Sequence, residues 1–127
     1  MCINKLRQAI HHIQSEIGKK EMPAYWIEFL LLVAEAGDEG ITTKKTVETL
    51  GMSQGIASRI VKLMSDCYFE KDFKAQYDKS NEDTPLVRFE GYGLLKTESD
   101  LVHRHRQRLF LSEKGKRIVE EAVSFMT

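Results

Sequence analysis

The chain has 127 residues, which is the length of one domain and enough to bury a single modest core. Its hydrophobic fraction of 42%, its charged fraction of 30% and its net charge of zero are those of an ordinary soluble globular protein. It has no apolar run as long as a membrane span, no signal-peptide core and no metal-type spacing of its two cysteines, so we expect a reduced, cytoplasmic protein without a membrane partner.

Residues 2–20 form the first predicted helix. Its apolar residues recur at alternating steps of three and four and make a narrow stripe: Ile3, Leu6, Ile10, Ile13 and Ile17. Such a stripe suits either the core of its own domain or the same helix of a second subunit, and both interpretations stay open. His11 and His12 are adjacent and point to different sides of the helix, so they do not form an i, i+4 metal pair.

A second helix is predicted from Pro23 to Ala36. It is apolar on most sides, which is typical of a helix at the centre of a core. Pro23 is well placed near its start. Gly37 and Gly40 bracket a turn, after which Ile41 forms a short extended segment.

The segment 42–66 predicts two short helices around a tight turn. Thr42 or Thr43 can cap the first helix, Gly51 lies where the chain turns left-handed, and Ser53 can cap the second helix. Apolar residues at helical spacing supply an inward-facing seam: Val47, Leu50, Met52, Ala57, Ile60 and Met64. This is the layout of a helix-turn-helix unit.

The polar face of the second of these helices has residue types that suit DNA binding. A helix-turn-helix unit presents base-reading side chains near the N-terminal end of this helix. Gln54 can pair with adenine, and Arg59 with a guanine edge or a phosphate. Ser58 and Lys62 can bind phosphates. The competing interpretation is an ordinary pair of crossing helices with a solvated face, because short patterns of this kind recur by chance.

Residues 67–91 lie between the helix-turn-helix unit and the next regular pattern. Much of this segment is charged or polar, and Ser80 to Pro85 has the composition of a turn. We expect the preceding helix to continue through Cys67 to about Lys79 and a loop to follow.

Residues 92–112 predict a β-hairpin wing. The strand candidates are residues 86–98 and 102–112, separated by a turn at Ser99 to Leu101. Phe110 falls on the same face of the second strand as its basic residues, which alternate with period two: Arg104, Arg106 and Arg108.

Ser112 can cap a last helix, residues 113–127. Helix, helix, helix-turn-helix, hairpin and closing helix together make a winged helix. The predicted fold class is therefore mostly α with a small β-hairpin wing, in a single domain of residues 1–127: a winged helix-turn-helix with an additional N-terminal helix and a closing C-terminal helix.

The distribution of charge favours a nucleic-acid partner although the net charge is zero. Residues 42–62 contain four basic residues and one acidic residue, and residues 101–117 contain six basic residues and one acidic residue. The intervening residues 63–100 contain five basic and nine acidic residues. A neutral protein with two positive segments can still present one basic face.

Two separated blocks resemble the MarR family of bacterial transcriptional regulators. GMSQGIASRIVKLM, residues 51–64, is similar to the family's recognition helix, which often reads like GVSQPTVSRLVDRLE. Gly93-Leu94-Leu95 resembles the family's strand entry, and LSEKG, residues 111–115, resembles its hairpin exit, often LTEKG. The resemblance covers about two thirds of the chain. It implies a winged-helix fold, DNA binding and transcription regulation.

The wing and the last helix depart from the family pattern. The family's Asp-x-Arg motif, whose arginine reaches the minor groove, falls on His103 and His105 here. The wing turn at 98–100 is acidic, and about two dozen more residues than usual separate the recognition helix from the wing. The family builds its dimer interface from terminal helices, and the last helix here is short. Either the first helix supplies more of the interface, or this chain associates differently.

We expect a homodimer that binds double-stranded DNA and regulates transcription, with recognition helix 53–66 in the major groove and the basic hairpin on the backbone or minor groove. Ile56 occupies a family position often held by threonine, where it can touch a thymine methyl. The candidate DNA-binding residues are Thr43, Lys44, Lys45, Ser53, Gln54, Gly55, Ile56, Ser58, Arg59, Lys62, Arg104, Arg106 and Arg108. The alternatives are a plasmid or phage replication or partition protein, and a winged helix that binds protein through the acidic insert and wing.

The sequence makes no case for an enzyme, a cofactor or a metal site. It contains no recognisable nucleophile–base pair, phosphate-cradling glycine loop or carboxylate pair. His103 and His105 alternate on a strand, but no carboxylate or cysteine is placed to complete a site. A redox-active thiol stays an alternative, although neither cysteine has obvious cationic neighbours in the sequence. A small-molecule effector is compatible with the expected function, and the sequence identifies none.

Overall fold

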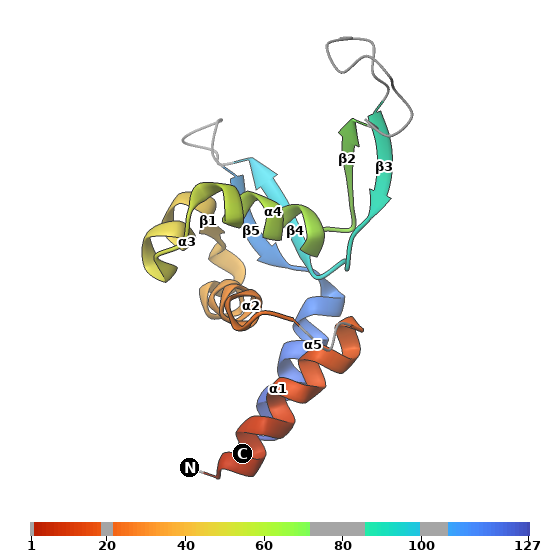
Figure 1. Cartoon of the computed structure of the whole chain (residues 1–127). Coiled ribbons are helices and arrows are strands. Elements are labelled where there is room, and N and C mark those ends of the chain that lie inside the picture. Colours follow the sequence, from red (N-terminus) through yellow and green to blue (C-terminus); the bar gives the residue numbers. More distant parts are fainter. Residues whose placement is uncertain (1, 19–21, 72–85, 100–106) are drawn as a thin grey trace.

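The computed structural model describes residues 2–18, 22–71, 86–99 and 107–127 (Figure 1). In these residues the chain forms five α-helices, a three-stranded sheet and a separate two-stranded hairpin. The order of the elements confirms the predicted fold class, a winged helix-turn-helix with an added helix at each end. None of the described helices combines the length and the hydrophobicity that crossing a bilayer requires.

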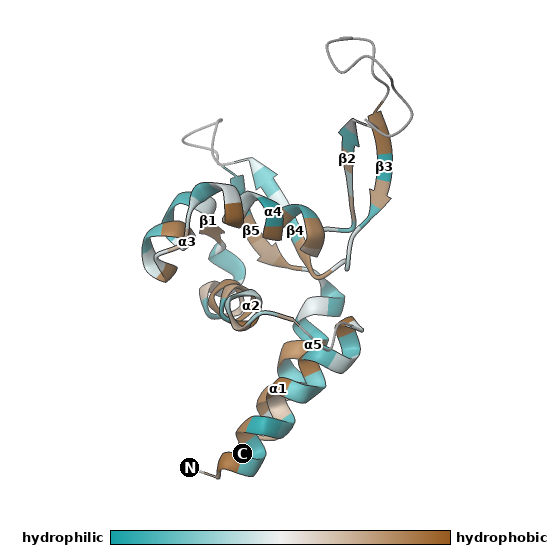
Figure 2. Ribbon diagram, viewed as in Figure 1, coloured by the Kyte–Doolittle hydropathy of each residue, from teal (hydrophilic) through white to brown (hydrophobic). Residues whose placement is uncertain are grey.

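Helix α1 (Ile3–Ile17) lies along helix α5 (Glu113–Ser124), and Figure 1 shows this pair extending away from the other elements, with both termini at its free end. The apolar stripe of α1 is divided. Ile13 and Ile17 are 2% and 8% exposed, so the core interpretation is confirmed for this half, whereas Ile3 and Leu6 are 82% and 41% exposed. Figure 2 shows apolar and polar bands alternating along α1.

Helix α2 (Ala24–Ala36) supplies the centre of the core, with Phe29, Leu30 and Val33 fully buried. Pro23 is the N-cap residue, so the helix begins one residue later than predicted and ends at Ala36 as predicted. A 3₁₀ turn, η1 (Gly37–Glu39), and Gly40 lead into strand β1 (Ile41–Thr42). A Cβ at Gly40 would lie 2.7 Å from the Phe110 ring, so the glycine allows this aromatic side chain to pack against the turn.

Helices α3 (Thr43–Leu50) and α4 (Gln54–Met64) form the predicted helix-turn-helix unit. The hydroxyl of Thr42 caps α3 by accepting a bond from the Lys45 amide, 3.1 Å, and Ser53 caps α4 through the Ile56 amide, 3.2 Å. Gly51 has a left-handed φ of 68° at the turn. Ala57, Ile60 and Met64 are buried, so the predicted seam between the helices is confirmed.

The predicted wing consists of strands β4 (Leu95–Ser99) and β5 (Gln107–Leu111), paired antiparallel. β1 pairs with the other edge of β5, which gives the sheet order β1-β5-β4. Leu95, Leu109 and Leu111 are buried and fix the sheet to the core. Residues 100–106, which include Arg104, Arg106 and both wing histidines, lie outside the described residues.

The segment after α4 differs from the prediction. The expected helical continuation to Lys79 is wrong, because α4 ends at Met64 and Cys67–Lys71 forms strand β2, paired antiparallel with strand β3 (Leu86–Glu90). The single strand expected over residues 86–98 is also wrong. It is divided into β3 and β4, which belong to different sheets.

The physical reason for both corrections lies in the backbone between β3 and β4. The amides of residues 91–94 bond to the carbonyls of residues 63–66, with N–O distances of 2.7–3.0 Å. These bonds satisfy carbonyls at the C-terminal end of α4, which otherwise have no intrahelical partner. A Cβ at Gly91 would lie 1.8 Å from the Ser65 carbonyl oxygen, so this close approach requires glycine.

Candidate nucleic-acid interface

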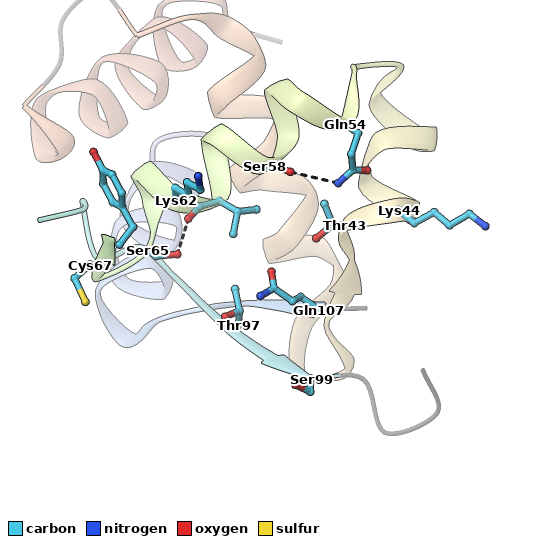
Figure 3. Close-up of a pocket in the computed structure, with 12 residues that line it drawn as sticks. Thr43, Lys44, Gln54, Ser58, Lys62, Ser65, Cys67, Thr97, Ser99 and Gln107 are labelled. Atoms are coloured by element: carbon cyan, nitrogen blue, oxygen red, sulfur yellow. Dashed lines mark hydrogen bonds between the residues drawn. The ribbon is translucent and has the colours of Figure 1, made fainter. Parts of the chain in front are cut away.

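The exposed polar face of α4 and the wing border an open groove of about 750 Å³ (Figure 3). Helix α3 contributes at one end and strand β2 at the other. Among the described residues that line it, none is acidic and two are lysines. The groove is lined mainly by hydroxyl, amide and ammonium groups from Thr43, Lys44, Gln54, Ser58, Lys62, Ser65, Tyr68, Thr97, Ser99 and Gln107. Groups of these kinds bind phosphate oxygens and base edges in protein–DNA complexes.

The capped start of α4 sets the direction of its polar side chains. Ser53 holds the first turn, so Gln54 begins the helix and lies four residues from Ser58 on the same face. The Gln54 amide lies 3.4 Å from the Ser58 hydroxyl and donates a long hydrogen bond to it (Figure 3). All predicted α4 contacts are exposed, as the periodicity indicated: Gln54, Gly55, Ile56, Ser58, Arg59 and Lys62.

Lys44 and Lys45 are exposed in the first turn of α3. Cations at a helix N-terminus oppose the helix dipole, at a cost of about 0.3–1 kcal/mol each. Helix stability therefore gives no reason for lysines at these positions. Attraction to an external anion gives one, and Lys44 lines the groove.

Lys62 has a carboxylate neighbour from outside the helix. Its Nζ lies 3.6 Å from Glu70 Oε1 of β2, and both side chains are about half exposed. A surface pair of this kind contributes little to stability. It does place a negative charge next to one of the two groove lysines.

The wing arginine that the structure describes is engaged with the backbone. Arg108 is half-buried, and its guanidinium donates to the Glu39 carbonyl at 3.0 Å and, at the limit of a hydrogen bond, to the Gly40 carbonyl at 3.5 Å. These bonds join β5 to the turn before β1. Contact of Arg108 with DNA stays a prediction, as does contact of Arg104 and Arg106, which lie outside the described residues.

Sequence reasoning missed seven residues of the groove: Val61, Ser65, Cys67, Tyr68, Thr97, Ser99 and Gln107. The sequence pattern of the wing could have identified its three groove residues. Thr97 and Ser99 lie on one face by strand alternation, and Gln107 pairs with Ser99. Cys67 and Tyr68 had no such pattern once residues 67–79 were predicted as helix.

The hairpin register pairs Arg88 with Phe69, so Arg88 is a diagonal neighbour of Cys67 on the same face. A hydrogen bond with the Cys67 side chain and the nearby Glu90 carboxylate raise the pKa of the Arg88 guanidinium above its usual value. Cys67 therefore has a cationic neighbour that lies twenty-one residues away in the sequence.

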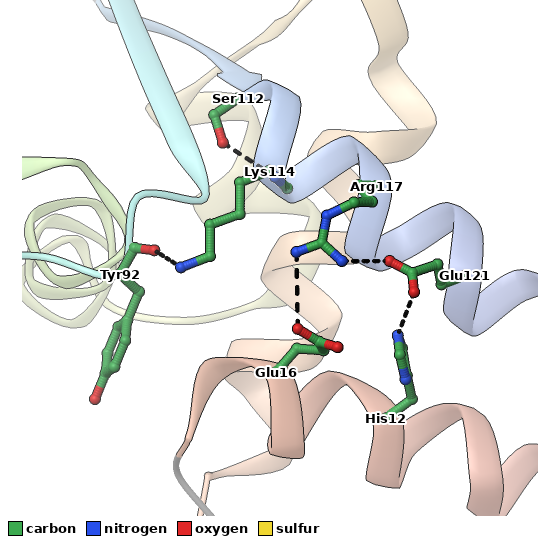
Figure 4. A network of polar contacts seen from close by, with 8 residues as sticks. His12, Glu16, Tyr92, Ser112, Lys114, Arg117 and Glu121 are labelled. Carbon is green, nitrogen blue, oxygen red and sulfur yellow. Dashed lines mark hydrogen bonds and ion pairs between the residues drawn. The ribbon is translucent and has the colours of Figure 1, made fainter.

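A second polar cluster joins α1 to α5, away from the groove (Figure 4). Arg117 contacts Glu121 at 2.6 Å and Glu16 at 3.7 Å, and His12 Nε2 lies 3.5 Å from Glu121. The ligand atoms of His12, Glu16 and Glu121 lie within 4.8 Å of one another, a spacing that a metal ion could bridge. Arg117, however, already pairs with both carboxylates, and its guanidinium would repel a cation. We interpret the cluster as an ion-pair network that holds the two helices together.

Comparison with known proteins finds likeness in structure but not in sequence. No protein-family model and no curated protein matches the chain. Among solved structures, S. aureus MepR in complex with DNA aligns with a TM-score of 0.63 and 11% identity, covering 97% of this chain and 77% of that one. The PcaV transcriptional regulator from Streptomyces coelicolor, bound to its natural ligand, gives 0.55 and 15%, covering 97% and 68%. MarR gives 0.55 and 16%, covering 97% and 70%. At these identities the likeness shows the fold, which is MarR-like.

Proposed function

We propose that this MarR-like winged helix-turn-helix protein binds double-stranded DNA in a sequence-specific manner and regulates transcription. The observation that carries the proposal is the groove: a recognition helix with an exposed polar face borders a channel whose described lining contains two lysines and no carboxylate. The solved complex of the similar MepR with DNA supports the same use of the fold.

Some residues would recognise the DNA sequence, and others would bind the backbone and position the protein on it. Gln54 and Arg59 supply the groups that pair with base edges in the major groove. Lys44 and Lys45 supply attraction to phosphates, which does not depend on sequence and weakens with salt. Ile56 is 43% exposed on α4, so its side chain is accessible to a thymine methyl.

Paired variants of Arg59 and Lys45 test this division, with a duplex selected from random DNA as the preferred site. Arg59→Ala should weaken binding to the preferred site by about 1–3 kcal/mol and reduce the difference in affinity between that site and random DNA. Lys45→Ala should weaken binding to both duplexes similarly and reduce the salt slope by about one. Fluorescence anisotropy at several salt concentrations measures both quantities.

Equal losses from the two variants on both duplexes would show that α4 does not read sequence. If the wild type binds no DNA even at low salt, the result favours the alternative of a winged helix that binds protein. The position of the footprint decides the biological role. A footprint at a promoter supports transcription regulation, and one at a replication origin or partition site supports a plasmid or phage maintenance protein.

We also propose that the protein acts as a homodimer through the free ends of α1 and α5. Large apolar side chains are exposed there: Ile3, Leu6, Ile10, Val123 and Phe125. A two-fold dimer presents its recognition helices to successive major grooves about 34 Å apart, so the site would be an inverted repeat with half-sites one turn apart.

Leu6 and Leu31 form a matched pair for testing the dimer, because each is 41% exposed and they lie on different helices. Leu6→Glu should shift the mass in solution toward monomer and weaken binding to the full site far more than to a half-site. Leu31→Glu should leave both unchanged. Analytical ultracentrifugation at micromolar concentration measures the mass. A wild-type mass of one subunit, or equal effects of the two substitutions, would contradict the dimer.

A further inference from the structure

The β2–β3 hairpin is an insertion in the winged helix whose two ends lie next to each other. Its first residue, Cys67, pairs with its last, Glu90, and immediately outside this pair the Gly91 amide bonds to the Asp66 carbonyl at 2.9 Å. The hairpin starts at Cys67, three residues after the last residue of α4. Figure 1 shows this hairpin rising beside the C-terminal end of α4, with both the hairpin and the wing projecting toward the top of the view.

The two faces of the hairpin have different surroundings. Register and alternation put Tyr68 and Glu70 on one face with Phe89, and put Phe69 and Leu86 on the other. Tyr68 lines the groove, and Glu70 contacts Lys62 of α4, so the first face is turned toward the recognition helix. Among the described residues of the second face, Cys67 at the base of the hairpin is the one that also lines the groove. The rings of Tyr68 and Phe89 are stacked on the first face, with centroids 5.4 Å apart and an interplanar angle of 15°.

We propose that this hairpin is a second wing, whose Tyr68 face binds the sugar–phosphate backbone of double-stranded DNA beyond the C-terminal end of α4. The inference rests on the proposed function and extends its footprint. The groove beside α4 is continuous with the hairpin, because the same channel is lined by Ser58 and Lys62 of the helix and by Tyr68 of β2.

The chemistry of this end of the groove suits phosphate oxygens. Tyr68 supplies a hydroxyl donor and Lys62 an ammonium group, and these groups make backbone contacts in DNA complexes. The Ser65 hydroxyl already donates to the Val61 carbonyl at 2.5 Å. The stacking of Tyr68 on Phe89 holds the tyrosine ring in place, so binding need not immobilise it. Glu70, the carboxylate on this face, is paired with Lys62.

Two duplexes that differ on the hairpin side test the proposal. The first ends at the boundary protected by α4 and the wing, and the second continues for half a helical turn past it. The wild type should bind the longer duplex more tightly, by roughly three- to tenfold, the worth of one or two net hydrogen bonds. Hydroxyl-radical footprinting should show protected sugars in the added half-turn.

Adjacent residues on opposite faces of β2 provide the variant and its control. Tyr68→Phe removes the hydroxyl but keeps the stacked ring, and Tyr68→Ala removes both. Both should abolish most of the preference for the longer duplex, and Phe69→Ser on the outer face should preserve it. Circular dichroism and thermal unfolding verify that each variant is folded, and Tyr68→Phe keeps the test decisive if Tyr68→Ala does not fold.

Equal wild-type affinity for the two duplexes would overturn the second wing and leave the proposed function intact. The second wing is also overturned if Phe69→Ser removes the preference as strongly as Tyr68→Phe does. Absence of wild-type binding to either duplex would overturn both the second wing and the proposed function.

Discussion

The two hairpins beside α4 are held in place by different means. The wing, β4–β5, buries Leu95, Leu109 and Leu111 in the core and gains a third strand from β1. Among the strands that the structure describes, β2 and β3 pair only with each other, and their described side chains are exposed or half-buried. A two-stranded hairpin alone is marginally stable in water. The position of the wing is therefore fixed by the core, whereas that of β2–β3 depends on a few contacts at its base.

The largest expected effect separates the hairpins by stability. Leu109 of the wing is 0% exposed and Leu86 of β3 is 64% exposed. Leu109→Ala should lower the free energy of unfolding by about 2–5 kcal/mol, because it leaves a cavity in the core. Leu86→Ala should change it by less than about 0.5 kcal/mol. Urea unfolding followed by circular dichroism measures both. Similar losses would mean that β2–β3 is as much a part of the cooperative core as the wing.

A smaller effect is expected at the base of β2–β3. Gly91→Ala would place a methyl group against the Ser65 carbonyl, and the backbone on both sides must shift. The cost should be about 1–3 kcal/mol, as for overpacked sites. Gly55→Ala is the control, because a Cβ at Gly55 meets nothing within 4 Å and alanine favours helix by about 1 kcal/mol. An unfolding free energy unchanged by Gly91→Ala would show that the junction is not tight.

The same contrast explains how far the sequence predicts the fold. The wing, α2 and the helix-turn-helix unit follow local rules: caps at Thr42 and Ser53, a left-handed glycine at Gly51, and apolar periodicity. The β2–β3 hairpin does not. Whether the chain continues as helix after Met64 depends on the amides of residues 91–94, more than twenty-five residues away, which bond to the carbonyls of residues 63–66. No window around Cys67 contains that information.

The candidate site divides in the same way. Exposure of Gln54, Ser58 and Lys62 follows from helical period and was predicted correctly. The Lys62–Glu70 pair and the place of Tyr68 in the groove depend on the β2–β3 register, so the sequence did not reveal them. Contact of any of these residues with DNA stays a prediction.

The smallest expected effect concerns the ion pair that joins the β2–β3 hairpin to the recognition helix. Glu70 lies 3.6 Å from Lys62 and offsets part of its attraction to phosphates. Glu70→Gln removes the negative charge while nearly preserving the shape of the side chain. Binding to DNA of any sequence should strengthen by about 0.2–1 kcal/mol, the usual worth of an exposed pair, and the salt slope should steepen by up to about one.

Glu90→Gln is the matched control for this ion pair. It makes the same charge change in the same hairpin, but Glu90 pairs with Arg88 and does not line the groove. Anisotropy titrations of both variants over a range of salt separate a local effect from the change in net charge. If the two variants strengthen binding equally, net charge alone accounts for the gain, and Glu70 does not act through Lys62. If only Glu70→Gln strengthens binding, the β2–β3 hairpin lowers the non-specific affinity for DNA through Lys62 of α4. The described residues of the wing contain no ion pair with α4 that could have this effect.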